Sequence, residues 1–172
     1  MAKSKKGEVT SILPNFCADL RKLEAKQVIW EKIREDAVEP FKKHESDSGY
    51  DLTLLDLKQV NDRIEVYGTG IKIKPSPGYY FNLVARSSLF KSGRMLANSI
   101  GIIDESYRGE ILVVMYNFSN TDKERFYFPL DLPGRYVQII PRARTYVDFI
   151  EGMVDDTARS EGGFGSTGLN KL

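Results

Sequence analysis

Short apolar or alternating segments, separated by Gly, Pro, Asn and Asp, dominate the chain from Gln27 onward. Such segments with turn residues between them are typical of an all-β domain. Only Ser88–Leu96 lacks alternation, and Gly93 interrupts it, so we expect at most one short helix or 3₁₀ turn there. The pattern predicts strands at Val28–Ile33, Tyr50–Leu54, Arg63–Tyr67, Gly70–Ile73, Tyr79–Ala85, Ile111–Asn117, Glu124–Phe128 and Tyr136–Pro141.

The two ends of the chain differ from this middle part. Residues 1–26 are mixed, with a short helical pattern at Asp19–Lys26, and we interpret them as an extension before the domain. Residues 27–154 are expected to form the one domain that a chain of 172 residues predicts. Residues 155–172 are rich in glycine and poor in apolar residues, which predicts a tail that is mobile until a ligand or partner orders it. A sandwich, a barrel and a jelly roll all fit this pattern.

Composition excludes several kinds of site. Cys17 and His44 are the only residues of their types, so an internal disulfide, a Cys/His zinc site and a Ser-His-Asp triad are not expected. A metal would have to bind oxygen atoms, which favours Mg²⁺ on substrate phosphates.

The net charge of +1 and the absence of a long apolar run bear on partners and location. No surface for a nucleic-acid duplex and no membrane span are predicted. The first residues carry lysines but no signal-peptide pattern, so we expect an unprocessed cytoplasmic chain, with a nucleus, an organelle or a viral host cell left open.

The tail contains the segment RSEGGFGSTG at residues 159–168. Glycines let the backbone approach an anion, and Ser166 and Thr167 add hydroxyl donors beside Gly165. Phe164 is placed to stack on a flat ring, and Arg159 can bind phosphate oxygens as a fork. The alternative is a disordered terminus without a ligand. The segment lacks the Gly-Lys-Ser/Thr ending of a Walker P-loop.

Three other segments carry candidate chemistry. Asp104, followed by Tyr107 and Arg-Gly, indicates a tight loop between apolar strands, where sites are usually placed; a simple Asp turn explains the same residues. Arg86 with two following serines suits a phosphate contact. Asp51 alternates with Tyr50 and Leu52, which predicts a carboxylate on the polar face of a strand.

In this order and spacing, the segments resemble the five motifs of the trimeric dUTPase family. The matching segments are GYDL at 49–52, RSSL at 86–89, GIIDESYRGEI at 101–111, RYVQII at 135–140 and RSEGGFGSTG at 159–168. The chain departs from the family pattern at Ser160 and Ser88, where glycine is usual, and at Pro133–Gly134 before the fourth motif.

The resemblance implies a distorted jelly-roll subunit of the β-clip type in a homotrimer. Three active sites would lie between subunits, and each mobile, glycine-rich tail would close over a neighbour's site. The implied activity is Mg²⁺-dependent hydrolysis of dUTP to dUMP and pyrophosphate, which keeps uracil out of DNA and supplies dUMP.

The resemblance also implies a role for each motif residue. Asp104 would be the general base for the attacking water, and Asp51 and Gln138 would hold waters on the magnesium. Asn98, with the backbone of Gly101 and Ile103, would pair with uracil. Tyr107 would pack on the deoxyribose and Phe164 would stack on the base. The expected phosphate contacts are Arg86, Ser87, Ser88, Arg135, Arg159, Ser166 and Thr167. Gln138 and Gly165 are further expected substrate contacts.

Two other functions remain open from the sequence. A dCTP deaminase shares this fold and an Arg-Ser-Ser-Leu segment, and a shared fold does not fix the chemistry. A nucleotide-binding regulatory protein is the alternative from another class, with the first 26 residues or the stretch NTDKERFYFPLD contacting a partner.

Overall fold

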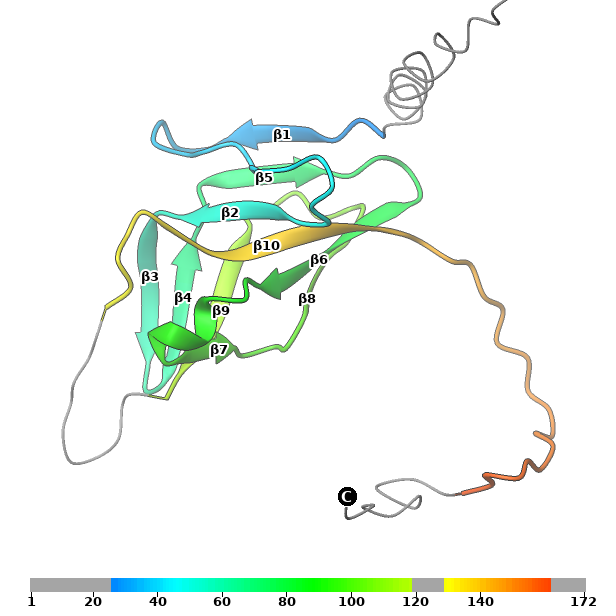
Figure 1. The fold of residues 1–172 in the computed structure, drawn as a ribbon. Helices are drawn as coiled ribbons and strands as arrows, with labels where there is room; N and C mark the ends of the chain where they lie inside the picture. The colour runs from blue at the N-terminus through cyan, green and yellow to red at the C-terminus, as the bar shows by residue number, and fades with distance from the viewer. Residues whose placement is uncertain (1–25, 119–128, 162–172) are drawn as a thin grey trace, which may run out of the picture.

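The chain folds almost entirely into strands (Figure 1). The structure is a computed structural model that describes residues 26–118 and 129–161. Within these ranges the one helical element is a short 3₁₀ helix, η1. In chain order the elements are β1 (Ile29–Lys32), β2 (Tyr50–Leu54), β3 (Asp56–Asn61), β4 (Ile64–Gly68), β5 (Ile71–Lys74), β6 (Tyr79–Ala85), η1 (Leu89–Ser92), β7 (Arg94–Leu96), β8 (Gly101–Ile103), β9 (Leu112–Asn117) and β10 (Gly134–Ala143).

The described strands form two four-stranded sheets and one two-stranded sheet, all antiparallel. The first sheet has the order β2-β10-β6-β8, the second β3-β4-β9-β7, and β1 pairs with β5. After β4 and β5 the chain alternates between the two large sheets, because β6, β8 and β10 belong to the first and β7 and β9 to the second. This exchange gives the distorted jelly roll, and it brings β2 beside β10 although they are far apart in the sequence.

Strict alternation in the central strands decides which side chains face the core. Leu52 and Leu54 of β2, and Val137 and Ile139 of β10, are buried in one cluster with Tyr67, Val113 and Met115 from the second sheet. Burying an aliphatic side chain of this size contributes about 1.5–3 kcal/mol. The residues between them, such as Asp51 and Gln138, therefore lie on the outer face of the first sheet.

Several predicted elements differ from the observed ones. Strands β3 and β8 were not predicted, because β3 is a mostly exposed edge strand with a register shift between Leu57 and Gln59, and β8 has only three residues. Ser88–Leu96 contains the expected 3₁₀ turn, which ends at Gly93 with φ 66°, but Arg94–Leu96 then forms the unpredicted strand β7. The predicted strand Glu124–Phe128 and the helical pattern before Lys26 lie outside the described residues.

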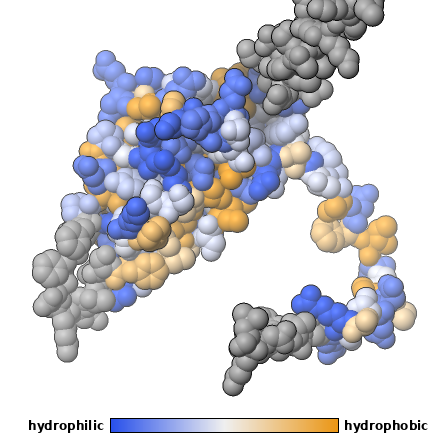
Figure 2. Space-filling model, in the orientation of Figure 1, coloured by the Kyte–Doolittle hydropathy of each residue, from blue (hydrophilic) through white to orange (hydrophobic). Residues whose placement is uncertain are grey.

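Residues 144–161 leave the body of the molecule after β10 and run away from it in an extended course (Figure 1). We call this segment the arm. Its apolar side chains Tyr146, Val147, Phe149, Ile150, Met153 and Val154 are all exposed, Phe149 at 97%. Figure 2 shows orange, apolar groups along the arm. Among the described residues, no helix has the length and apolar character needed to cross a membrane.

Candidate active site

A pocket of about 390 Å³ lies beside Asp51, on the outer face of the first sheet. We call it the Asp51 pocket. Asp51 of β2 and Gln138 of β10 are direct register partners in this sheet, and both line the pocket. Gly49 leaves the room that Gln138 occupies, because a Cβ atom there would collide with the Gln138 amide oxygen. The other lining residues are Lys42, Lys43, His44, Asp47, Ser48, Arg86, Ser87 and Ile140.

Two arginines converge on the Asp51 carboxylate. Arg86 Nε lies 3.0 Å from Asp51 Oδ1, and its Nη1 donates a hydrogen bond of 2.7 Å to the Arg135 carbonyl. Arg135 Nη1 lies 3.8 Å from Asp51 Oδ2, and its guanidinium group packs over the Phe41 ring. Both guanidinium groups are partly exposed, Arg86 in the lining of the pocket and Arg135 on the other side of the Asp51 carboxylate, so both can bind an anion beside Asp51.

Oxygen atoms in this pocket fit a hard cation that keeps most of its water. Asp51 offers a carboxylate that is mostly but not fully buried, and its register partner Gln138 offers an amide oxygen in the same pocket. In the described part of the chain, no cluster of three or more His, Cys, Asp and Glu side chains is placed to hold a metal. Two protein groups together with waters and phosphate oxygens are the usual environment of Mg²⁺.

The turn before Arg135 differs from the family pattern in sequence. The Leu132–Pro133 peptide bond is cis, and β10 begins directly at Gly134. A Cβ atom at Gly134 would collide with the Asp131 carbonyl and the Tyr136 ring. Glycine is therefore required here, and the turn still delivers Arg135 to Asp51.

Asp104 lies at the opposite edge of the first sheet, directly after β8. Its carbonyl accepts a hydrogen bond of 3.1 Å from Tyr107 N, which closes a tight turn. The Tyr107 hydroxyl donates to the Glu110 carbonyl at 2.9 Å, and a Cβ atom at Gly109 would collide with that hydroxyl. The exposed Asp104 side chain lines a pocket of about 610 Å³ with Tyr79, Tyr80, Ile102, Glu105, Ser106, Arg108 and Arg144.

Glu105, the neighbour of Asp104, is held by other groups. Its Oε2 accepts a hydrogen bond of 2.9 Å from Gly78 N and lies 3.2 Å from Arg144 Nη2. These contacts fasten the loop to the turn before β6 and to the start of the arm. Asp104 is thus the carboxylate of this loop that faces solvent.

A smaller hollow of about 180 Å³ adjoins this loop and brings together Asn98, Gly101, Ile103 and Tyr107, all predicted from the sequence to contact the nucleoside. A Cβ atom at Gly101 would lie 3.3 Å from Asn98 Nδ2 and 3.1 Å from Leu83 Cβ, so glycine keeps this space open. Ser99, in the turn between them, has a left-handed φ of 59°. The remaining lining residues are Leu83, Ile102, Ile111, Leu112 and Val114.

Within one chain, Asp51 and Asp104 are far apart. Asp51 is level with Val84 on β6, whereas Asp104 follows Ile103, which pairs with Phe81. Three strand spacings separate β2 from β8, roughly 14 Å, and about four residues along β6 add roughly 13 Å. The Asp51 pocket and the Asp104 loop therefore form two separate half-sites on one subunit.

The other predicted site residues are placed as follows. Ser87 lines the Asp51 pocket, and Ser88 is the N-cap of η1, where its side chain makes no capping hydrogen bond. Arg159 lies in the arm and is exposed. The predicted contacts Phe164, Gly165, Ser166 and Thr167 lie outside the described residues.

Sequence reasoning missed several residues that line the Asp51 pocket: Lys42, Lys43, His44, Asp47, Ser48 and Ile140. The signal available was a pair of lysines shortly before GYDL, but basic residues in a polar loop usually indicate only a solvated surface.

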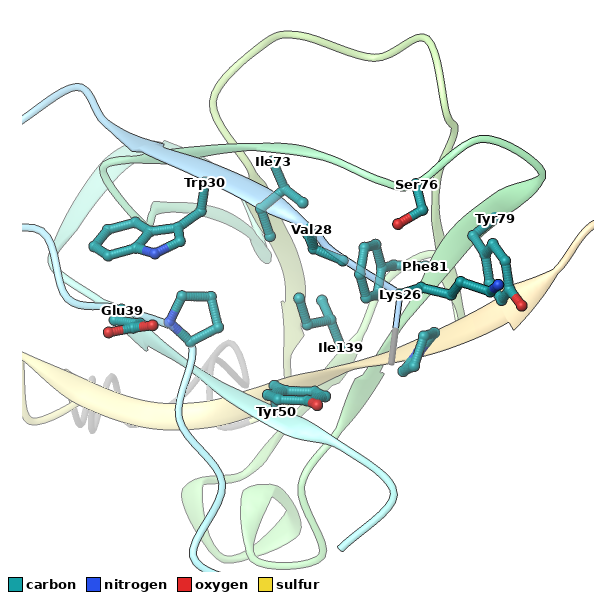
Figure 3. A pocket seen from close by; sticks show the side chains of 12 residues that line it. Lys26, Val28, Trp30, Glu39, Tyr50, Ile73, Ser76, Tyr79, Phe81 and Ile139 are labelled. Carbon is teal, nitrogen blue, oxygen red and sulfur yellow. The ribbon is translucent and has the colours of Figure 1, made fainter. Parts of the chain in front are cut away.

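A fourth hollow, mostly apolar and of about 380 Å³, lies between β1 and the first sheet (Figure 3). Trp30 of β1 and Val28, just before this strand, face Tyr50, Phe81 and Ile139 across it. We call it the Trp30 groove. It contains none of the predicted site residues.

Comparison with known proteins places these features in one family pattern. A family model described as dUTPase matches residues 35–168. A deoxyuridine 5'-triphosphate nucleotidohydrolase from Hydrogenobaculum sp. (strain Y04AAS1) is 37% identical over 147 residues, which cover 83% of this chain and 99% of that protein.

Solved structures show the same fold. A dUTPase of Staphylococcus bacteriophage 80alpha with dUPNHPP superposes with a TM-score of 0.62 at 20% identity, covering 83% of this chain and 99% of the other. A dUTPase variant of phage phi11 of S. aureus, which coordinates a structural Mg(II) ion, has a TM-score of 0.60 at 16% identity, covering 76% and 99%.

Proposed function

This chain belongs to the dUTPase family and is a dUTP diphosphatase, and we propose that its Asp104 activates the water that attacks the α-phosphorus of dUTP. The products are dUMP and pyrophosphate. The observation that carries this function is the family match over residues 35–168, a range that includes both half-sites.

Asp104 has the position that a general base requires. It is exposed at the tip of a rigid turn, whereas the adjacent Glu105 is held by Gly78 and Arg144. A carboxylate within about 2.6–3.2 Å of a water can accept its proton as the oxygen attacks phosphorus. Phosphoryl transfer otherwise asks the protein to align the groups and to neutralise charge, so a covalent nucleophile is not needed.

The Asp51 pocket is proposed to bind the triphosphate. Asp51 and Gln138 would hold waters of a bound Mg²⁺, which supplies positive charge to the phosphate oxygens. Arg86, Ser87, Ser88 and Arg135 would bind the phosphates directly. The convergence of Arg86 and Arg135 on Asp51 supports this role, because an anion can take over their charge without a large movement. The dUTPase variant of phage phi11 coordinates a structural Mg(II) ion, so a protein of the same fold binds this cation.

The Asn98 hollow is proposed to select the base and the sugar. Asn98 and the backbone at Gly101 and Ile103 would pair with the polar edge of uracil. A site built from such donors and acceptors leaves groups unpaired against cytosine, which costs about 1–3 kcal/mol for each. Tyr107, fixed by its hydroxyl hydrogen bond to Glu110, would pack on the deoxyribose and exclude a 2′-hydroxyl.

The separation of Asp51 from Asp104 supports a site shared between chains. A base that holds the attacking water and a cation on the same triphosphate must lie within several ångströms of the α-phosphorus. The separation of roughly 14 Å across the sheet and 13 Å along it is too large for one chain to supply both. A closed ring of three copies, each giving its Asp51 pocket to the next copy's Asp104 loop, gives three complete sites.

The arm supports the same assembly. Its exposed apolar residues, from Tyr146 to Val154, leave a surface that water does not favour, and another copy is the partner that matches it. The receiving surface that the fold offers is the Trp30 groove beside β1, whose one partner strand among the described residues is β5. An arm docked there would carry Arg159, Phe164, Gly165, Ser166 and Thr167 to a site on another chain.

Three parts of the chain have proposed roles. We propose that residues 1–26 form an extension, that 27–154 form the catalytic domain and that 155–172 close the site. The chain is proposed to act in the cytoplasm.

One assay tests the function against its alternatives. The protein is incubated with Mg²⁺ and either dUTP or dCTP, and the release of pyrophosphate and of ammonia is followed. We expect pyrophosphate from dUTP and no ammonia from dCTP. Ammonia from dCTP would indicate a deaminase, and tight dUTP binding without turnover would indicate a regulatory protein.

A further inference from the structure

The loop between Phe41 and Asp51 is a fixed wall of the Asp51 pocket. Phe41 and Asp51 form an antiparallel bridge, with hydrogen bonds of 3.0 Å from Phe41 N to the Asp51 carbonyl and 2.6 Å from Asp51 N to the Phe41 carbonyl. Inside the loop, Asp47 N donates to the His44 carbonyl at 3.0 Å, and His44 N donates to Asp47 Oδ2 at 2.9 Å. The backbone of this loop is therefore tied to the strand that carries Asp51.

Two adjacent lysines in this loop have different surroundings. Lys42 Nζ donates to the Glu45 carbonyl at 2.9 Å and to the Asp47 carbonyl at 3.3 Å, and it lies 4.9 Å from the centre of the Tyr50 ring. Lys42 thus holds the loop together. Lys43 is exposed, lines the pocket and has no hydrogen bond or ion pair with another residue in the described ranges.

The other cations of the pocket already have partners. Lys42 is bonded to two carbonyls of the loop, and Arg86 is paired with Asp51 and bonded to the Arg135 carbonyl. Arg135, which does not line the pocket but reaches the same carboxylate, is shared between Asp51 and the Phe41 ring. Among the described lysines and arginines that line this pocket, Lys43 is consequently the one whose charge has no protein partner and is available to a ligand. A lysine ammonium binds phosphate as a point charge and needs no bidentate geometry.

We propose that Lys43 binds the pyrophosphate portion of dUTP and helps the enzyme select triphosphate over monophosphate. This inference rests on the proposed triphosphate role of the Asp51 pocket. The α-phosphorus must face Asp104 of another copy, which lies outside this pocket. The β- and γ-phosphates of dUTP then lie against the loop that carries Lys43. The same contact holds pyrophosphate after cleavage.

The test compares Lys43→Ala and Lys43→Arg with Lys74→Ala. Lys74 is an exposed lysine at the end of β5 that does not line the pocket, so its replacement removes the same charge elsewhere. Binding of inorganic pyrophosphate with Mg²⁺ and of dUMP is measured by calorimetry, and the KM for dUTP is measured by pyrophosphate release.

We expect Lys43→Ala to weaken pyrophosphate binding and to raise the KM for dUTP by about five- to tenfold, the size of a charge-assisted contact at a partly exposed site. The dissociation constant for dUMP should change less than about twofold, since dUMP lacks the phosphates concerned. Lys43→Arg should retain most of the affinity, and Lys74→Ala should match the wild type.

Pyrophosphate binding that is unchanged in Lys43→Ala would overturn the inference. So would equal weakening of pyrophosphate and dUMP, which would indicate a general distortion of the pocket. The pyrophosphate titration decides the role of Lys43 even if the wild-type protein does not turn over dUTP, a result that would count against the proposed function instead.

Discussion

Arg94 and Glu65 form an ion pair in the interior of the protein, with both side chains only 1% exposed. Arg94 Nε and Nη2 donate to the two carboxylate oxygens at 2.5 and 3.0 Å. The Tyr67 hydroxyl and the Asn117 amide donate to the same carboxylate at 2.6 and 2.8 Å. The cluster joins β4, β7 and β9 of the second sheet, and its charges are tolerable there because each has several partners.

Arg94→Met is expected to destabilise the protein by about 3–5 kcal/mol, because it leaves the Glu65 carboxylate buried without its positive partner. The free energy of unfolding is measured by urea denaturation. Lys72→Met is the control, since Lys72 and Glu31 form an exposed pair at 4.0 Å and its loss should cost less than about 1 kcal/mol. A cost for Arg94→Met no larger than that for Lys72→Met would contradict the role of the buried pair.

Acid should remove the contribution of this cluster. Burial alone would raise the pKa of the Glu65 carboxyl, but hydrogen bonds from Arg94, Tyr67 and Asn117 outweigh it and hold the pKa below the ordinary value of 4.5. A carboxylate whose pKa is lowered on folding adds stability above its unfolded pKa and loses it as the pH falls through the folded pKa.

We therefore expect Glu65→Gln to be less stable than the wild type near neutral pH, with the difference shrinking as the pH falls below 4.5. Urea denaturation of both proteins between about pH 7 and pH 3 checks this window. A difference that stays constant over the whole range would mean that Glu65 does not titrate with folding.

Where apolar and polar residues strictly alternate, the exact bounds of a strand could be predicted from the sequence. Tyr50–Leu54 and Tyr79–Ala85 match because one face of each is buried and the other is not. Strand β3 was missed because it is an exposed edge, where no core imposes a pattern. The burial of Glu65 and Arg94 had no sequence signal either, since charged residues are nearly always exposed.

For the candidate site, the local sequence pattern predicted individual residues but not which of them lie together in the fold. Asp51 meets Gln138 because β10 pairs with β2, a contact between distant segments that no local periodicity contains. The family resemblance supplied that link. It did not select Lys43, because a lysine in a polar loop looks the same whether it faces solvent or a ligand.

Asp104→Asn should retain dUTP binding and lose hydrolysis. Asparagine keeps the shape but cannot accept the proton, so kcat should fall by about 10²–10⁴-fold while the affinity for dUTP changes little. Single-turnover kinetics and equilibrium binding separate the two effects. Glu105→Gln is the matched control. Because the Glu105 carboxylate is held by Gly78 and Arg144, this variant should keep most of the wild-type activity. Turnover near the wild-type rate in Asp104→Asn would show that the base is misassigned.

Truncation after Thr157 should leave an assembled protein with little activity, because the last strand in the described residues ends at Ala143 and the removed residues include Arg159 and the glycine-rich segment. A site that is not closed misplaces the substrate, and kcat/KM should fall by about 100-fold or more. Light scattering checks the assembly and pyrophosphate release checks the activity. Truncation after Gly168 removes only the last residues and serves as control. Full activity after loss of residues 158–172 would refute their role in closing the site.

Mixing two inactive variants tests whether the site is shared between chains. Asp51→Asn and Asp104→Asn are each expected to be inactive, because either change damages every site of a uniform assembly. If one copy gives its Asp51 pocket to the Asp104 loop of the next, any mixed ring of three contains one site with both aspartates intact. Mixed assemblies, purified through a different tag on each variant, should therefore recover about one third of the wild-type activity.

The control mixes wild-type chains with tagged chains that carry both Asp51→Asn and Asp104→Asn. A ring with two wild-type chains and one doubly substituted chain should keep one intact site of three. A ring with one wild-type chain and two doubly substituted chains should have none. Absence of any recovery in the first mixture would place Asp51 and Asp104 in the same site of a single chain. That result would overturn the shared site, which rests on the three strand spacings, roughly 14 Å, that separate β2 from β8 in the first sheet.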